Sequence, residues 1–178
     1  MAKKILIIVP SHDFRDEEYF IPNSLFEKAG FIVDTASTAL GIAYGIMGGE
    51  AEVNLLLERS ELKDYTSVVF VGGPGAKGYF DHSEAHRIAK EAAKLKIVLA
   101  AICIAPVILA RSGVLAGKRA TVWTSKLDKK AIQDLAQGGA SYLKERLVTD
   151  DNIITAEGPD AASDFATAII QKIKSPNL

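Results

Sequence analysis

Short, continuous apolar runs recur along the chain, and segments with a different periodicity separate them. The runs are rich in Val and Ile and cover Ile5–Val9, Phe31–Val33, Val68–Val71, Ile97–Ile102 and Ile153–Thr155. An apolar run without alternation is typical of a strand that is covered on both faces, as in a parallel sheet. The runs therefore predict the strands of a mostly parallel sheet.

Between these runs lie segments with helical spacing of apolar residues. They cover about Asp16–Ala29, Ser83–Leu95, Pro106–Ser112, Lys129–Gln137 and Asp160–Ile173. In the last segment Phe165, Ala168 and Ile169 follow spacings of three and four residues, which is the pattern of one helix face. Pro22 lies inside the first segment and predicts a kink or a late start of that helix.

The segment Gly41–Val53 has another pattern, because four glycines alternate there with apolar residues. This pattern predicts a small β-hairpin beside the main sheet. Strands that alternate with helices predict an α/β doubly wound fold with helices on both faces and right-handed crossovers. Ligands of such sheets bind at the carboxyl ends of the strands, so we expect a site just after Val9, Val71 and Ile102.

Length, charge and cysteine content narrow the class of protein. The chain has 178 residues, and no linker or repeat divides it, so we treat residues 1–178 as a single domain. It has 21 Lys and Arg against 22 Asp and Glu, which gives no electrostatic reason to expect nucleic acid or an anionic membrane as a partner. With one cysteine, no internal disulfide forms, and no apolar run reaches the length of a membrane span. We therefore expect a cytoplasmic protein.

Cys103 lies where a predicted strand gives way to a predicted helix, because Ile102 ends the strand and Pro106 suits a first helical turn. The positive end of the helix dipole and free backbone N–H groups favour a thiolate at this place. A cysteine in this position resembles the nucleophile elbow of serine hydrolases. The alternative is a small buried apolar residue, since free cysteines are often buried.

The loop after Val71 is rich in glycine, and residues 73–78 formally match the dinucleotide-binding pattern G-x-G-x-x-G. The match is weak, because no Asp or Glu follows at the expected distance. A second interpretation is that the turn at Gly72 and Gly73 directs backbone N–H groups at an oxyanion above Cys103. The third is a tight turn without a chemical role.

The loop after Val9 continues into the acidic run Asp16-Glu17-Glu18. Such runs are usually solvated surface or charge at a helix N-terminus. A carboxyl group held beside a thiolate, however, has a raised pKa and can exchange a proton. The pattern alone does not choose between Glu17 and Glu18.

Together these loops resemble the ThiJ/PfpI family of the class I glutamine-amidotransferase-like superfamily. The resemblance rests on Glu18-Tyr-Phe-Ile-Pro22, Val69-Phe-Val-Gly-Gly-Pro-Gly75, Ala101-Ile-Cys-Ile-Ala-Pro106, Gly113-Val-Leu-Ala-Gly-Lys118 and Ala156-Glu-Gly-Pro159. It implies a flavodoxin-like fold, a nucleophilic Cys103 and Glu18 as its carboxyl neighbour. It also implies an oxyanion hole from the N–H groups of Gly73 and Ile104, and a homodimer or larger oligomer.

The chain departs from the family pattern in its histidines. Family members place a histidine directly after the nucleophile, where this chain has Ile104, or in the loop that here reads Trp123-Thr-Ser-Lys126. His12 is the one histidine near the expected site and is a candidate accessory residue, with Gly72 and Trp123. His82 and His86 have the spacing of a metal pair but are expected to be exposed surface residues, so we predict no metal and no cofactor.

The resemblance implies a cysteine-dependent enzyme similar to the glyoxalase III and deglycase members, acting on small dicarbonyls or their adducts through Cys103 and Glu18. This chemistry needs a thiolate and one acid–base group. A cysteine peptidase or amidase is the second interpretation, because amide cleavage also needs a proton for the leaving amine. A redox sensor or chaperone in which Cys103 is oxidised is the third. A nucleotide-binding protein is the least favoured.

Overall fold

The computed structural model describes residues 3–175. Among these, a central sheet has seven strands in the spatial order β11 (Leu147–Asp150), β12 (Ile153–Ala156), β8 (Val98–Ile102), β7 (Tyr65–Phe70), β1 (Lys4–Ile8), β3 (Ile32–Ser37) and β6 (Leu55–Leu56). Neighbouring strands are parallel except at one edge, where β11 and β12 form an antiparallel pair. The predicted flavodoxin-like α/β fold is confirmed.

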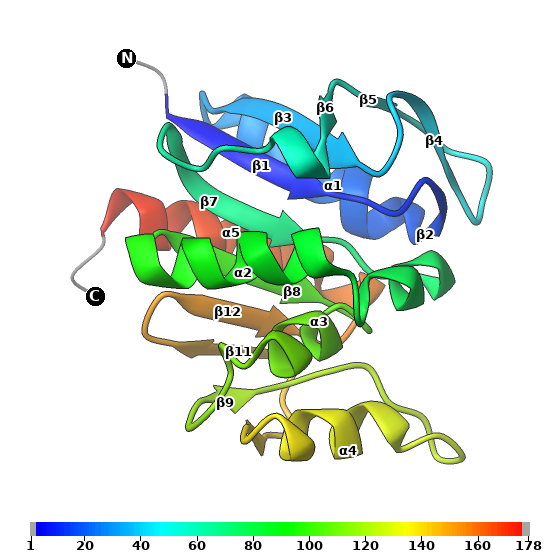
Figure 1. Cartoon of the computed structure of the whole chain (residues 1–178), viewed down its shortest axis with the longest axis vertical. Helices are drawn as coiled ribbons and strands as arrows, with labels where there is room; N and C mark the ends of the chain where they lie inside the picture. Colours follow the sequence, from blue (N-terminus) through cyan, green and yellow to red (C-terminus); the bar gives the residue numbers. More distant parts are fainter. Residues whose placement is uncertain (1–2, 176–178) are drawn as a thin grey trace.

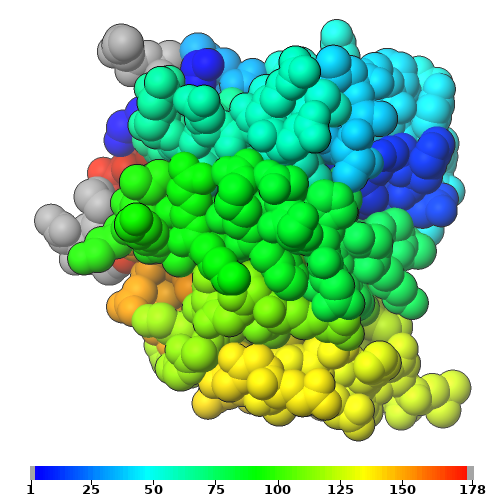
Figure 2. Space-filling model, in the orientation of Figure 1, coloured from blue at the N-terminus to red at the C-terminus, as the bar shows by residue number. Residues whose placement is uncertain are grey.

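Helices cover both faces of this sheet (Figure 1). One face carries α1 (Asp16–Lys28) and α5 (Ala162–Lys174), and the other carries α2 (Ser83–Leu95) and α3 (Pro106–Ser112), with α4 (Lys130–Gln137) packed against α3. Figure 2 shows the α2 side in green, closely packed between the cyan segments above and α4, in yellow, below. In the part of the chain that the structure describes, no helix has the length and apolar character needed to cross a bilayer.

The residues of β1 show why the strands have continuous apolar sequences. Ile5 and Ile7 belong to the core cluster under α1 and α5, whereas Leu6 and Ile8 belong to the cluster under α2 and α3. All four are fully buried. Successive side chains of a strand point to opposite faces, so a sheet with helices on both sides needs apolar residues at every position.

The predicted hairpin is present as β4 (Gly41–Gly45) and β5 (Glu50–Val53), which pair antiparallel. A strand that the sequence did not predict, β2 (His12–Phe14), pairs parallel with β4 and gives a second sheet of three strands. Short strands β9 (Arg119–Ala120) and β10 (Ser141–Tyr142) form a separate parallel pair and were also not predicted.

Pro22 lies inside α1 without delaying it, so the predicted late start is wrong. The helix begins at Asp16 and continues through Pro22 to Lys28. The Asp16 carboxylate anchors this beginning, because it accepts hydrogen bonds from the backbone N–H groups of Met47 and Gly49 in the β4–β5 turn, at 2.8 and 2.7 Å. Three acidic residues in the first turn also interact favourably with the helix dipole.

The strand order reverses beside β1, which places the carboxyl ends of three strands next to one another. From β1 the chain moves to β3 on one side and later returns to β7 on the other. The next strand outward is β8, which ends one residue before Cys103. Loops that follow such a reversal leave a crevice at the sheet edge, and the predicted site residues meet there.

Candidate active site

Cys103 forms a sharp turn between β8 and α3. Its backbone is in the left-handed region, with a φ of 64°, and its side chain is partly buried. The Cys103 N–H donates to the carbonyl of Ala156 at 2.9 Å, and its carbonyl accepts the N–H of Trp123 at 2.8 Å. A non-glycine residue in this conformation carries backbone strain, and strain of this kind concentrates at functional sites. The geometry is that of a nucleophile elbow.

Glu18 lies beside this cysteine on the first turn of α1 and has no solvent-exposed surface. Its Oε2 accepts the backbone N–H of Gly72 at 3.0 Å. Its Oε1 is buried and has no N–H or O–H donor among the described residues, and the Cys103 thiol lies within hydrogen-bonding reach of the carboxyl group. Glu17, in contrast, points outward and forms an ion pair with Arg15 at 2.8 Å. The structure thus places Glu18, not Glu17, next to the sulfur.

Gly72 makes this close approach possible. A Cβ atom at position 72 would lie 2.6 Å from Cβ of Cys103 and 2.7 Å from Oε2 of Glu18, which is closer than real side chains pack. The loops that follow β1, β7 and β8 can therefore come this close together only because residue 72 has no side chain.

Backbone N–H groups of Gly73 and Ile104 face the sulfur of Cys103, and their hydrogen bonds favour the thiolate. Gly73 has a φ of 97°, and a Cβ there would lie 2.5 Å from the backbone nitrogen of Arg15. Its glycine identity therefore follows from packing against the loop before α1, and no dinucleotide is needed to explain it. The arrangement supplies two donors for a negative charge that develops beside Cys103.

Burial dominates the electrostatics of the pair. Burial raises the pKa of Glu18 from 4.5 to about 7, against the lowering effects of Cys103 and the Gly72 N–H. Burial, followed by the negative charge of Glu18, raises the pKa of Cys103 from 9.0 to about 12. The predicted lowering of the thiol pKa is therefore wrong, because desolvation outweighs the two backbone N–H groups. Between the two values the pair holds one proton, and a thiolate forms when that proton is on Glu18.

A pocket of about 280 Å³ opens in front of the sulfur. Five of its lining residues were predicted from the sequence, namely Glu18, Gly73, Cys103, Ile104 and Trp123. Five others were not predicted, namely Arg15, Ile46, Pro74, Lys77 and Pro159. Arg15 and Lys77 lie in two of the loops already expected to form the site. A basic side chain in such a loop is the sequence signal that could have identified them. Ile46 comes from the β4–β5 turn and had no local signal.

The histidines lie away from this pocket. His12 is exposed on β2 and stacks on Tyr44, with ring centroids 5.9 Å apart. His82 and His86 are both partly buried, so the prediction that they are exposed surface residues is wrong. The His82 ring lies edge-on to Tyr79, and the Nε2 of His86 is 2.7 Å from the carbonyl oxygen of Phe80. Within residues 3–175, no group of three or more potential metal-ligating side chains comes together. Of the accessory candidates, the structure brings Gly72 and Trp123 to the site but leaves His12 outside it.

A model of the DJ-1/PfpI family matches residues 3–172, which include every residue of the pocket. The chain belongs to the DJ-1/PfpI family. An uncharacterized protein of Methanocaldococcus jannaschii is 38% identical over 175 residues, covering 98% of this chain and 84% of the relative.

Other family members extend the comparison to function and structure. The glutathione-independent glyoxalase DJR-1.2 of Caenorhabditis elegans is 25% identical over 174 residues, covering 98% of this chain and 90% of that protein. The crystal structure of a ThiJ/PfpI domain protein from Brachyspira murdochii superposes with a TM-score of 0.92 at 30% identity, covering 98% of both chains. Drosophila melanogaster DJ-1beta gives a TM-score of 0.84 at 25% identity, covering 97% of this chain and 91% of that one. The DJ-1/PfpI family thus includes at least one glyoxalase that is similar along nearly the whole chain.

Proposed function

We propose that this protein is a cysteine-dependent glyoxalase-type enzyme that converts small α-oxoaldehydes, such as methylglyoxal, into 2-hydroxy acids. The observation that carries the proposal is the buried Glu18 carboxyl group beside Cys103, which has a pKa of about 7 and one oxygen that receives no N–H or O–H donor from residues 3–175. A group with this pKa both accepts and gives up a proton near neutral pH.

The reaction needs only groups that the pocket contains. The Cys103 sulfur adds to the aldehyde carbon and forms a hemithioacetal, while the Gly73 and Ile104 N–H groups hold the oxygen. Glu18 takes the proton from the former aldehyde carbon and returns one to the neighbouring carbon. Water then cleaves the resulting thioester and releases the 2-hydroxy acid and the thiol. The aldehyde carbon is oxidised and the ketone carbon reduced, so no external oxidant is required. Adducts of dicarbonyls with amines or thiols would enter the same pathway, which is the deglycase form of the proposal.

Peptide hydrolysis is less well supported by the same pocket. A leaving amine needs a general acid, and among the described residues no histidine lines the pocket. Glu18 is buried at the base of the site, and in the proposed reaction it transfers a proton from one carbon atom of the substrate to the next.

The deciding measurement is lactate formation from methylglyoxal by the wild type, Cys103→Ser, Glu18→Gln and His12→Ala. Cys103→Ser should abolish turnover, and Glu18→Gln should reduce kcat by about 10²–10⁴-fold, as expected for loss of general acid–base catalysis. His12→Ala is the matched control and should remain within a few-fold of wild type. Methylglyoxal turnover that survives Cys103→Ser would reject the proposal. Casein cleavage that depends on Cys103 but not on His12 would favour the peptidase.

The assembly proposed for this protein is a homodimer. Large apolar side chains are exposed on α1 and on the β4–β5 turn next to the pocket, namely Phe20, Ile21, Ile46 and Met47. A second copy that covers this surface would bury apolar area and also enclose the pocket on the side of Ile46. Sedimentation of the wild type and of Ile21→Lys tests this, since the charged residue should shift the protein toward the monomer. We also propose a cytoplasmic setting, because the chemistry requires a reduced Cys103.

A further inference from the structure

Two basic side chains line the pocket, and neither has a part in the proton transfers described above. They are Arg15, which directly precedes α1, and Lys77, in the 3₁₀ helix Pro74–Tyr79 that follows the glycine-rich loop. Both reach the pocket that contains the Cys103 sulfur, although 62 residues separate them in the chain, so the fold brings two positive charges to one small cavity.

Lys77 is exposed, and its ammonium group has no ion-pair or hydrogen-bond partner among residues 3–175. Arg15 is partly engaged, because its Nε and one terminal nitrogen donate to the Glu17 carboxylate at 2.8 and 3.1 Å. A guanidinium group has five N–H donors, so this pairing leaves donors for a second anion. The charge of Arg15 also interacts with Glu18 and Cys103, which places it within electrostatic range of the reacting atoms.

The charges divide the pocket into two ends. At the base, the pair of Glu18 and Cys103 carries one negative charge once Glu18 has lost its proton, that is, as pH rises above about 7. Along the wall are the positive charges of Arg15 and Lys77, and the remaining walls include the apolar side chains of Ile46, Trp123 and Pro159. Methylglyoxal has no charged group, so neither Arg15 nor Lys77 would form an ion pair with it.

We propose that the preferred substrate is an α-oxoaldehyde that carries an anionic group, a carboxylate or a phosphate, which Lys77 and Arg15 bind while the aldehyde meets Cys103. This inference deepens the proposed function and rests on it for the identity of the reacting group. For the probe 4,5-dioxopentanoate, addition of water and the internal transfer of hydrogen give 2-hydroxyglutarate. Atoms and electrons balance as they do for methylglyoxal and lactate.

The first test needs no enzymatic turnover, because Cys103 is the single thiol of the chain. Iodoacetate is an anion and iodoacetamide is a neutral reagent of similar size, so the ratio of their alkylation rates reports the charge around the sulfur. Lys77→Gln should lower this ratio about threefold or more at low salt, and added salt should shrink the difference. Lys94→Gln, on the exposed face at the end of α2, is the matched control and should leave the ratio unchanged.

The second test compares kcat/KM for 4,5-dioxopentanoate with kcat/KM for methylglyoxal. The wild type should prefer the anionic compound, and Lys77→Gln should reduce that preference about tenfold, chiefly through KM, because a charge-assisted hydrogen bond is lost. A phosphate-bearing oxoaldehyde in the same assay distinguishes the two anionic groups. Absence of any oxoaldehyde turnover would reject the proposed function alone, and the alkylation ratio would then decide the anion site. An unchanged ratio in Lys77→Gln would overturn the inference.

Discussion

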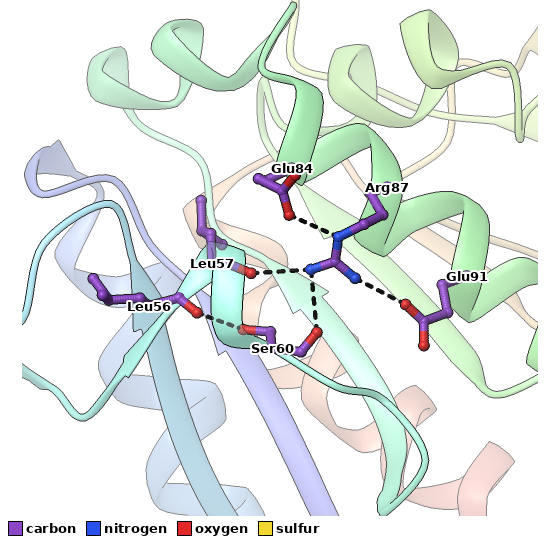
Figure 3. A network of polar contacts seen from close by, with 6 residues as sticks. All are labelled: Leu56, Leu57, Ser60, Glu84, Arg87 and Glu91. Carbon is purple, nitrogen blue, oxygen red and sulfur yellow. Dashed lines mark hydrogen bonds and ion pairs between the residues drawn. The ribbon is translucent and has the colours of Figure 1, made fainter.

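Two polar clusters of this protein differ in how completely their groups are paired. Around Arg87 on α2, the guanidinium group donates to Glu84 at 2.7 Å, to Glu91 at 2.9 Å, and to the carbonyl oxygens of Leu57 and Ser60 at 3.1 and 3.2 Å (Figure 3). The three charged side chains are each about one-third exposed. This cluster ties the segment after β6 to α2, and each charge in it has a partner.

The Glu18–Cys103 pair has the opposite character. Glu18 is fully buried, receives one backbone N–H, and has an oxygen without an N–H or O–H donor among the described residues. Cys103 has a strained backbone conformation. A buried polar group that lacks partners costs free energy, whereas a paired cluster stabilises the fold. The Arg87 cluster therefore stabilises the fold, whereas the pair at the sheet edge costs stability. A catalytic role for the pair, as in the proposed function, would account for that cost.

The largest effect should appear in the pH dependence of stability, through Glu18. In the folded protein its pKa is about 7, against 4.5 for an unperturbed carboxyl group. The stabilising contribution is therefore fully present below pH 4.5 and is lost as pH rises through about 7, because the unfolded chain releases the proton first. The loss amounts to about 3 kcal/mol. The amide of Glu18→Gln does not ionise, so this variant should not lose stability as pH rises. It should be about 3 kcal/mol more stable than wild type at pH 8 and similar to it at pH 4.

Urea unfolding of the wild type and Glu18→Gln at several pH values measures this contribution. Glu17→Gln is the comparison, since Glu17 is about one-third exposed and lies outside the pocket. The hydrogen bond from Arg15 lowers the pKa of Glu17, so this variant should lose a little stability at pH 8, which is the opposite sign from Glu18→Gln. A stability difference between wild type and Glu18→Gln that does not change with pH would contradict the assigned protonation.

A smaller effect, in the opposite direction, is expected at Arg87. Arg87→Met keeps the aliphatic stem but removes four hydrogen bonds, two of them to backbone carbonyls. The expected loss is about 2 kcal/mol of unfolding free energy, allowing for partial exposure of the ion pairs. The alkylation rate of Cys103 should remain within twofold of wild type, because the cluster does not contact the pocket.

Arg119→Met is the matched comparison for Arg87→Met. The Arg119 side chain is 59% exposed and its Nε lies 3.3 Å from Oδ2 of Asp150, so its removal should cost less than about 0.5 kcal/mol. Equal losses from both variants would show that the backbone contacts of Arg87 contribute nothing beyond its ion pairs.

The smallest effect is expected from Glu91→Gln, which removes one ion pair of the Arg87 cluster and leaves the backbone contacts. The pair has i,i+4 spacing on α2, and both side chains are about one-third exposed. The expected loss is about 0.3–0.5 kcal/mol at low salt and less at high salt. Thermal unfolding at two ionic strengths measures it, and a loss that persists at high salt would mean that the pair is less solvated than its exposure indicates.

Local patterns predicted most of the helices and central strands. The segments Ser83–Leu95 and Pro106–Ser112 form helices with the predicted bounds, because each contains its own start and stop signals. The strands β2, β6 and β11 and the pair β9–β10 were missed. β11 has four residues, and its last two, Thr149 and Asp150, are polar, so it lacks a continuous apolar run. The other missed strands have two or three residues and almost no periodicity, and their partners lie 19 or more residues away in the chain.

The properties of the site also fall into two groups, those set by residues that are neighbours in the chain and those set by residues far apart in it. The sequence by itself determined the α/β fold and the position of Cys103 at a strand–helix junction, since both depend on residues that are neighbours in the chain. Only the tertiary structure decided that Glu18 is buried, that the thiol pKa is raised, and that Lys77 and Arg15 face one pocket. These properties depend on desolvation and on charges held close together, and the hydrogen bond that fixes Glu18 joins residues 54 positions apart. No local pattern contains those distances, so they exist only once the three loops have folded together.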